Sequence, residues 1–176
     1  MIDSATLLVD KLRAAGQTVG TCESLTAGLI AAGIADVPGA SDVLRGGLVT
    51  YSDEVKTCLA QVPAELIDVH GAVSSQVAEA MATGARAALQ VDWAVGITGV
   101  AGPDPVDGNP VGTVWLAIAG PNGVHSVERV LPEGHTRWAL REGAPEPEEV
   151  MDGNRAEIRA ASAEYALQRL LDAVSA

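Results

Sequence analysis

The stretch SSQVAEAMATGARAALQVDWAVGITGVAGP (residues 74–103) indicates the fold class of this chain, because it joins a predicted long helix to a predicted buried strand. Ser74 is a helix-capping residue type, and the Ala-rich run after it predicts a helix through about Leu89. Residues Asp92–Ile97 (DWAVGI) are mostly apolar, as in a strand that is covered on both faces. A helix that leads into such a strand is typical of chains whose helices cover a central sheet.

The same alternation continues towards the N-terminus. We expect helices at Ile2–Ala15, Ser24–Ala35, Val55–Ala60 and Pro63–Val69, and strands at Gln17–Cys22 and Arg45–Tyr51. Gly16 and the sequence Val37-Pro38-Gly39 mark the ends of the first two helices, and Ser52 is a candidate cap for the third. The chain therefore begins with alternating helices and strands.

The C-terminal half departs from this alternation. Strands predicted at Thr113–Ala119 and Val124–Val130 form a hairpin around a Pro-Asn-Gly turn. Residues Pro132–Gly153 are predicted as an exposed loop, and Ala156–Val174 as a closing helix whose inward residues are Ile158, Ala161, Ala166, Leu167, Leu170 and Leu171. The whole order predicts a three-layer α/β/α sandwich with a mixed, mostly parallel sheet, in which residues 1–176 form a single domain.

The composition excludes several classes of partner. The 176-residue chain has 11 Lys and Arg against 23 Asp and Glu, and this net charge of -12 opposes binding to nucleic acid or an anionic membrane. The charged N-terminus is unlike a secretory signal, and no apolar run is long enough to span a bilayer. Cys22 and Cys58 lie far apart and support neither a disulfide framework nor a metal site. We expect a cytoplasmic protein and, because many small Ala-rich α/β enzymes self-associate, a homo-oligomer.

Ser24 is the first candidate for chemistry, because it follows a predicted strand and begins a predicted helix. Free N–H groups at a helix N-terminus bind anions, so a hydroxyl placed there suits reactions that develop an oxyanion. The alternative interpretation is that Ser24 is only a helix cap, which is a common role for serine.

Lys56 and Tyr51 lie at a second predicted junction of strand and helix. Lys56 is one of only two lysines in the chain. If it is buried near Ser24, desolvation favours its neutral amine, which can accept the hydroxyl proton, and Tyr51 can relay that proton or hold the amine. Alternatively, Tyr51 packs at the sheet edge and Lys56 is a solvated residue that pairs with Ser52 or Asp53.

Two further segments are compatible with ligand binding. The glycines of Gly96–Pro103 allow backbone N–H groups to approach a ligand, although the spacing matches neither a Walker loop nor a dinucleotide fingerprint. Arg155, before the last helix, is a fork donor suited to a phosphate or carboxylate, although such an arginine is more often a surface ion-pair partner. The three histidines are scattered and predict no metal site.

Five motifs occur together in an order that matches a known family. They are Glu23-Ser24-Leu25-Thr26-Ala27-Gly28, Gly46–Ser52 with Lys56, His70–Ser74, Gly96–Pro103 and Pro110–Trp115. On these motifs the chain closely resembles the CinA C-terminal domain family, whose characterised members are nicotinamide-nucleotide amidases. The resemblance covers nearly the full length of the chain.

The resemblance implies hydrolysis of the carboxamide of nicotinamide mononucleotide, which yields nicotinate mononucleotide and ammonia in pyridine-nucleotide recycling. It implies that Ser24 is the nucleophile, that Lys56 and Tyr51 assist it, and that no metal or other cofactor takes part. The oxyanion would be stabilised by N–H groups at the start of the helix after Ser24. The substrate-binding residues implied or hypothesised in this way are Thr26, Ala27, Gly28, Thr98, Gly99 and Arg155.

The sequence departs from the family pattern at three positions and in the stretch His135–Asp152, which is longer than usual and could lie over the site or away from it. The usual E-S-C-T-G-G reads E-S-L-T-A-G here, with Leu25 in place of Cys and Ala27 in place of Gly. The usual G-D-R before the last helix reads G-N-R, with Asn154 in place of Asp. Two alternatives to an amidase for nicotinamide mononucleotide therefore stay open. One is an amidase for another small amide, and the other is a weakly active or inactive module that binds a pyridine nucleotide or a protein partner.

Overall fold

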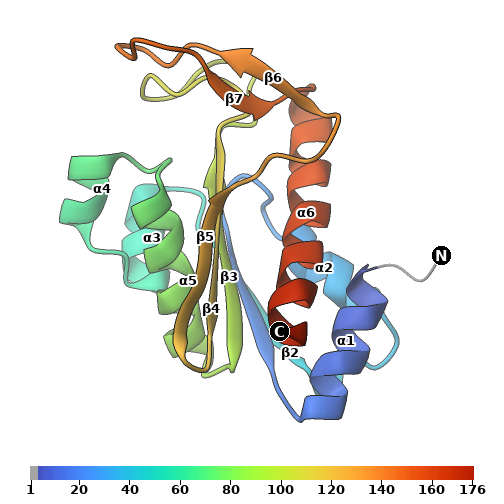
Figure 1. Cartoon of the computed structure of the whole chain (residues 1–176). Coiled ribbons are helices and arrows are strands. Elements are labelled where there is room, and N and C mark those ends of the chain that lie inside the picture. The colour runs from blue at the N-terminus through green and yellow to red at the C-terminus, as the bar shows by residue number, and fades with distance from the viewer. Residues whose placement is uncertain (1–3) are drawn as a thin grey trace.

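A five-stranded sheet packed between two layers of helices forms the centre of the computed structural model, which describes residues 4–176 (Figure 1). The strand order is β2-β1-β3-β4-β5, with bounds β1 Val19–Glu23, β2 Leu44–Val49, β3 Trp93–Gly99, β4 Val114–Gly120 and β5 Gly123–Arg129. β1 pairs in parallel with both β2 and β3, whereas β4 is antiparallel to β3 and β5. Every strand except β4 therefore runs in the same direction, which confirms the predicted sandwich with a mixed, mostly parallel sheet.

The helices divide between the two faces of the sheet (Figure 1). One face is covered by α1 (Ser4–Ala15), α2 (Leu29–Ala35) and α6 (Arg155–Ser175), and the other by α3 (Asp53–Ala60), α4 (Ala64–His70) and α5 (Ser75–Leu89). A short 3₁₀ turn, Ala40–Asp42, precedes β2. Burial of aliphatic side chains on both faces stabilises the sandwich.

The close packing of α5 on β3 depends on a glycine. A Cβ placed on Gly96 would lie 2.4 Å from both the carbonyl oxygen of Ala78 and the backbone nitrogen of Ala82. The small side chain allows the helix to approach the strand at the position where β3 leads into the loop of the candidate site.

Several predicted details of the helices are confirmed. The hydroxyl of Ser74 accepts a hydrogen bond from the Val77 N–H at 3.3 Å and so caps α5. The predicted inward residues of the last helix are buried or packed against the core. The predicted start of the first helix at Ile2 lies outside the described residues.

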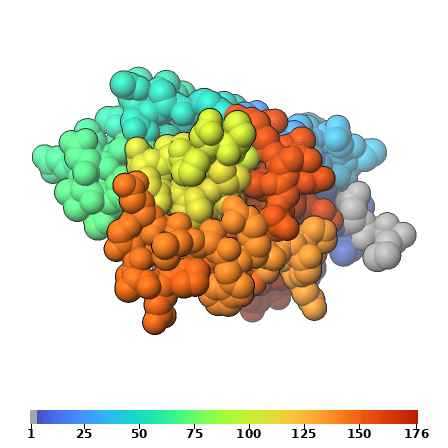
Figure 2. Space-filling model, turned by 90° about the horizontal axis from the view of Figure 1, so that it is seen from above, coloured from blue at the N-terminus to red at the C-terminus, as the bar shows by residue number. Residues whose placement is uncertain are grey.

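The prediction that Pro132–Gly153 is a loop is wrong, because this segment forms a second, two-stranded sheet. β6 (Thr136–Ala139) pairs with β7 (Glu148–Met151) in antiparallel fashion. This β6–β7 hairpin lies above the carboxyl end of the main sheet (Figure 1). Viewed from above, it lies beside the yellow loop 100–113 that follows β3 (Figure 2).

The β6–β7 hairpin is hydrogen-bonded to the loop 100–113 at Val111 and Gly112, where the two backbones pack closely. The Met151 N–H donates to the Gly112 carbonyl at 3.0 Å, and Arg137 Nη2 donates to the Val111 carbonyl at 2.7 Å. Gly112 has a φ of 94°, and a Cβ there would lie 2.0 Å from the Met151 carbonyl oxygen. Only glycine fits this position.

Candidate functional site

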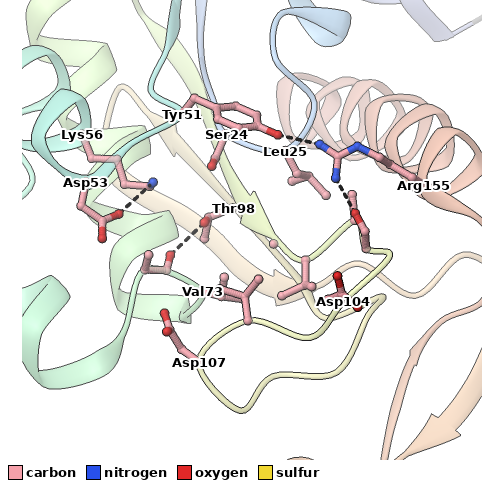
Figure 3. Close-up of a pocket in the computed structure, with 16 residues that line it drawn as sticks. Ser24, Leu25, Tyr51, Asp53, Lys56, Val73, Thr98, Asp104, Asp107 and Arg155 are labelled. Carbon is pink, nitrogen blue, oxygen red and sulfur yellow. Dashed lines mark hydrogen bonds and ion pairs between the residues drawn. The ribbon is translucent and has the colours of Figure 1, made fainter.

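A cleft of about 260 Å³ lies at the carboxyl ends of β1 and β3, where loops from distant parts of the sequence meet (Figure 3). Ligand sites of open α/β sheets are found at this edge. The cleft is lined by Ser24, Leu25, Tyr51, Asp53, Lys56, Ala72, Val73, Thr98, Gly99, Val100, Ala101, Gly102, Asp104, Val106, Asp107 and Arg155. Six of the nine predicted site residues therefore border one cavity. The other three, Thr26, Ala27 and Gly28, lie outside its lining.

The loop that carries Ser24 is ordered by the preceding residue. The fully buried Glu23 carboxylate accepts hydrogen bonds from the N–H groups of Gly28 at 2.8 Å, Ile30 at 3.1 Å and Ala31 at 2.9 Å. These donors belong to the start of α2, where a helix leaves N–H groups without internal partners. Glu23 thus joins the end of β1 to the beginning of α2.

This arrangement corrects the predicted helix at Ser24–Ala35. α2 begins at Leu29, after a turn in which Ala27 and Gly28 have φ values of 51° and 99°. Ser24 therefore does not cap a helix, and it lies one turn before the helix start. The N–H groups of Ala27 and Gly28, which we expected to face an oxyanion, already bond to the Ser24 carbonyl and to Glu23.

Arg159 of α6 holds the other side of the same loop. Its Nε donates to the Leu25 carbonyl at 2.8 Å and its Nη2 to the Thr26 carbonyl at 3.1 Å. The Ser24 N–H is bonded to the Ile97 carbonyl at 3.0 Å, which ties the loop to β3. The position of Ser24 is thus fixed by contacts with β1, β3 and α6.

The Ser24 hydroxyl is available for chemistry. The residue is only 8% exposed, and among residues 4–176 no group forms a hydrogen bond with its Oγ. In Figure 3 this oxygen points into the cleft. The backbone N–H groups of Leu25 and Thr26, which follow it, also have no partner within the described part of the chain. A buried hydroxyl beside two unpaired donors is suited to attack on a carbonyl carbon.

Lys56 is buried in the same cleft, so it is not the solvated residue of the alternative interpretation, although it pairs with Asp53 as that interpretation expected. It is 2% exposed, and its Nζ lies 3.2 Å from Asp53 Oδ1. The amine and the Ser24 hydroxyl both extend into the cavity (Figure 3). Asp53, which sequence reasoning considered only as a surface partner, therefore fixes the position of the amine from the rim.

Cys22, the buried cysteine of β1, is not a competing nucleophile. Burial raises the pKa of its thiol to about 11, although the Thr50 hydroxyl and the Lys56 charge act in the opposite direction. The thiol is therefore protonated near neutral pH, and a protonated thiol is a poor nucleophile.

Tyr51 and Arg155 meet at the open side of the cleft. Arg155 Nη2 donates to the Tyr51 hydroxyl at 2.6 Å, and Nη1 donates to the Gly102 carbonyl. Tyr51 is 57% exposed, and its hydroxyl points towards Arg155 in Figure 3. Arg155 thus connects the loop after β2 with the loop after β3.

Thr98 and Gly99 form part of the cleft wall at the end of β3. Thr98 Oγ1 donates to the Ala72 carbonyl at 2.8 Å, which links β3 to the segment before α5. A Cβ on Gly99 would lie 2.7 Å from the Thr113 carbonyl oxygen, so the loop returns very close to its own start. The glycine-rich motif therefore shapes the wall through close backbone approach.

Four acidic or basic residues of the site were missed by sequence reasoning as functional candidates. They are Glu23, Asp104, Asp107 and Arg159. The sequence contained a signal for Glu23, because this glutamate directly precedes Ser24 in the motif Glu23–Gly28. The role of Arg159 had none, because its contacts span more than 130 residues.

Neither a cluster of potential metal ligands nor a membrane-spanning helix occurs in the described part of the chain. In residues 4–176, no three His, Cys, Asp or Glu side chains are grouped so that they could hold a metal ion. Over the same range, no helix combines the length and apolarity that crossing a bilayer requires.

We expect the variant Glu23→Gln to lose about 3 kcal/mol of unfolding free energy. Its amide nitrogen would face backbone N–H donors, and each buried donor left without a partner costs about 1–3 kcal/mol. Urea denaturation measures the loss, and the exposed Glu79→Gln on α5 is the matched control. Equal midpoints for the two variants would show that Glu23 does not anchor the loop.

Comparisons with known proteins identify the family of the chain. The CinA C-terminal domain model matches residues 2–146. A CinA-like protein of Parasynechococcus marenigrum is 42% identical over 139 residues, which cover 78% of this chain and 33% of that protein. This chain spans about a third of the length of the curated relatives that it matches.

Solved structures show the same fold over nearly the whole chain. A CinA superfamily protein from Klebsiella pneumoniae has a TM-score of 0.82 at 29% identity, covering 98% of this chain and 96% of that chain. The competence/damage inducible protein CihA from Agrobacterium tumefaciens has a TM-score of 0.79 at 32% identity, with the same coverage. The chain therefore belongs to the CinA C-terminal domain family.

Proposed function

We propose that this protein is a nicotinamide-nucleotide amidase that releases ammonia from the carboxamide of nicotinamide mononucleotide. One observation carries the proposal: an unpartnered, buried Ser24 hydroxyl and the buried Lys56 amine line the same cleft. A hydroxyl and an amine so placed suit acyl transfer without a metal. The family resemblance supports the substrate, and the residues of the cleft support the reaction type.

In the acylation step, the Lys56 amine, after it has released its proton to solvent, accepts the Ser24 proton while Oγ forms a bond to the carboxamide carbon. The carbonyl oxygen becomes an oxyanion, for which the N–H groups of Leu25 and Thr26 are the available donors. The C–N bond then breaks, and the proton held by Lys56 passes to the leaving nitrogen. Ammonia departs and leaves an ester on Ser24.

In the second step, water cleaves this ester. Lys56 accepts a proton from the attacking water, and the oxygen forms a second tetrahedral intermediate. Collapse of this intermediate returns the proton to Ser24 Oγ and releases nicotinate mononucleotide. The protein ends in its starting state, so no further reactant is needed.

We propose that Arg155 binds the substrate phosphate and that Thr98 and Gly99 contact the ribose. Arg155 has five N–H donors, and its two bonds to Tyr51 and Gly102 leave others free. The net charge of -12 repels an anion at long range. A phosphate therefore requires a local donor such as this guanidinium.

The proposal is tested by measuring ammonia release from purified protein with nicotinamide mononucleotide, nicotinamide riboside and nicotinamide. Ammonia from the nucleotide at the highest kcat/KM supports the proposal. Release only from another small amide would assign a different substrate to the same chemistry. Binding of the nucleotide without ammonia release would favour a binding module.

We expect Tyr51→Phe to lower kcat/KM for the nucleotide about tenfold, because a hydrogen bond to a charged group is worth about 1.5 kcal/mol or more. The variant removes the hydroxyl that accepts from Arg155 and keeps the ring. Steady-state kinetics separate two roles: a fall in kcat indicates proton transfer, and a rise in KM indicates positioning of Arg155. An unchanged kcat/KM would remove Tyr51 from the mechanism.

A further inference from the structure

The acidic side chains of the cleft differ in whether they have an ionic partner. The lining contains three carboxylates, Asp53, Asp104 and Asp107, and two basic side chains, Lys56 and Arg155. Asp53 is paired with Lys56. Within residues 4–176, neither of the other two carboxylates forms an ion pair or a side-chain hydrogen bond. Both aspartates are exposed to solvent, so the rim of the cleft presents two negative charges without a counterion.

Both unpaired carboxylates belong to the loop that follows β3. In Figure 3 this loop lies across the cleft from Ser24 and Lys56. Asp107 occupies a tight turn closed by two hydrogen bonds between Val106 and Asn109, of 3.1 and 2.9 Å. The β6–β7 hairpin supports this turn, because the Glu142 N–H donates to the Gly108 carbonyl at 3.0 Å. The turn is thus held opposite the reactive serine.

Part of the cleft wall is apolar. Leu25, Val73, Val100 and Ala101 are buried side chains that line the cleft, and Val106 lies between the two aspartates in sequence. A flat aromatic ring is compatible with such walls. An amide carried by that ring must also reach the Ser24 hydroxyl, which is more than nine-tenths buried and lacks a partner in the described chain.

We infer that Asp104 and Asp107 recognise the positive charge of the substrate ring and so determine a preference for a cationic over a neutral aromatic amide. The inference rests on the proposed function, in which Ser24 attacks a carboxamide. A nicotinamide ring bonded to ribose through nitrogen carries a permanent positive charge, whereas the corresponding benzamide is neutral. A metal cation is a poorer occupant, because residues 4–176 contain no grouping of acidic side chains that could hold one.

Charge recognition has a specific physical consequence. Two carboxylates near a partly desolvated ring attract the cation and leave a neutral ring of the same shape almost unaffected. Replacement of both aspartates by asparagine keeps the shape of the cleft and removes this difference. The preference for the cation over its neutral isostere is therefore the quantity to measure.

The experiment uses the Ser24→Ala protein, so that binding is measured without turnover. Calorimetry gives the Kd of nicotinamide mononucleotide and of the neutral isostere benzamide riboside 5′-phosphate. Both are measured with and without the additional pair Asp104→Asn and Asp107→Asn. Asp36→Asn, an exposed change at the end of α2, is the matched control. Urea denaturation confirms that each variant is folded.

We expect the paired substitution to raise the Kd of the cationic nucleotide roughly tenfold and that of the neutral isostere less than twofold. Asp36→Asn should change neither value. Equal weakening of both ligands, no change in either, or failure of both to bind would overturn the inference.

The ammonia assay on the wild-type protein separates this inference from the proposed function. Ammonia release with no aspartate-dependent preference leaves the amidase in place and overturns the charge selection. An aspartate-dependent preference for the cation with no ammonia release retains the charge selection and overturns the amidase.

Discussion

Ser24→Ala should reduce ammonia release from nicotinamide mononucleotide by about 10³-fold or more, because it removes the atom that would form the bond to the carboxamide carbon. Binding of the nucleotide should persist, since the change deletes only one oxygen from the cleft. The free energy of unfolding should change by less than about 1 kcal/mol, because Ser24 Oγ forms no hydrogen bond within the described residues. Initial rates, calorimetric affinity and urea denaturation measure these three quantities.

Ser41→Ala, at an exposed serine of the 3₁₀ turn before β2, is the matched control and should retain wild-type rates. Ammonia release by Ser24→Ala within about threefold of the wild type would exclude Ser24 as the nucleophile. The alternative in which Ser24 has only a structural role predicts a different pattern, with lost stability and retained chemistry. The two roles are therefore distinguished by a single variant.

Lys56→Met should reduce kcat by about 10³-fold, within the range attributed to a positioned proton acceptor. Methionine keeps an unbranched apolar side chain in the buried space and deletes the amine. Asp53, the ionic partner of Lys56, has a side chain that is 54% exposed, so its loss of a partner should cost little stability. Measurements at saturating substrate separate this loss from weakened binding.

Lys56→Arg tests the nature of the contribution. Arginine keeps the positive charge but is effectively always protonated, so it cannot accept the serine proton. We therefore expect it to be as inactive as Lys56→Met. Near wild-type kcat in Lys56→Arg would show that only the charge matters. The other lysine, the exposed Lys11 of α1, supplies the control Lys11→Met.

The strands of the main sheet were predictable because their signals are local. Residues Asp92–Ile97 are apolar on both faces and are bounded by turn-forming residues, which is enough to predict a buried strand. The β6–β7 hairpin was not predictable in the same way, because its acidic, proline-containing sequence has the composition of a loop. Its strands depend on pairing with each other and on the attachment of Met151 to Gly112.

The candidate site was partly predictable for a related reason. Ser24, Tyr51 and Lys56 lie in short motifs beside predicted strand ends, and parallel strands bring such ends to one edge. The helix expected at Ser24 was a local inference, and it was wrong because the Glu23 side chain occupies the N–H groups at the helix start. Contacts from Arg159 to the same loop arise only from the tertiary fold.

The position of Arg155 and Arg159 on the last helix has a consequence for synthesis of the protein on the ribosome. The loop around Ser24 emerges early, but the two arginines that brace the loops of the cleft belong to the 21-residue α6 near the C-terminus. A nascent chain that still lacks α6 therefore has neither brace. The cleft acquires its final shape only when translation of the last helix is complete.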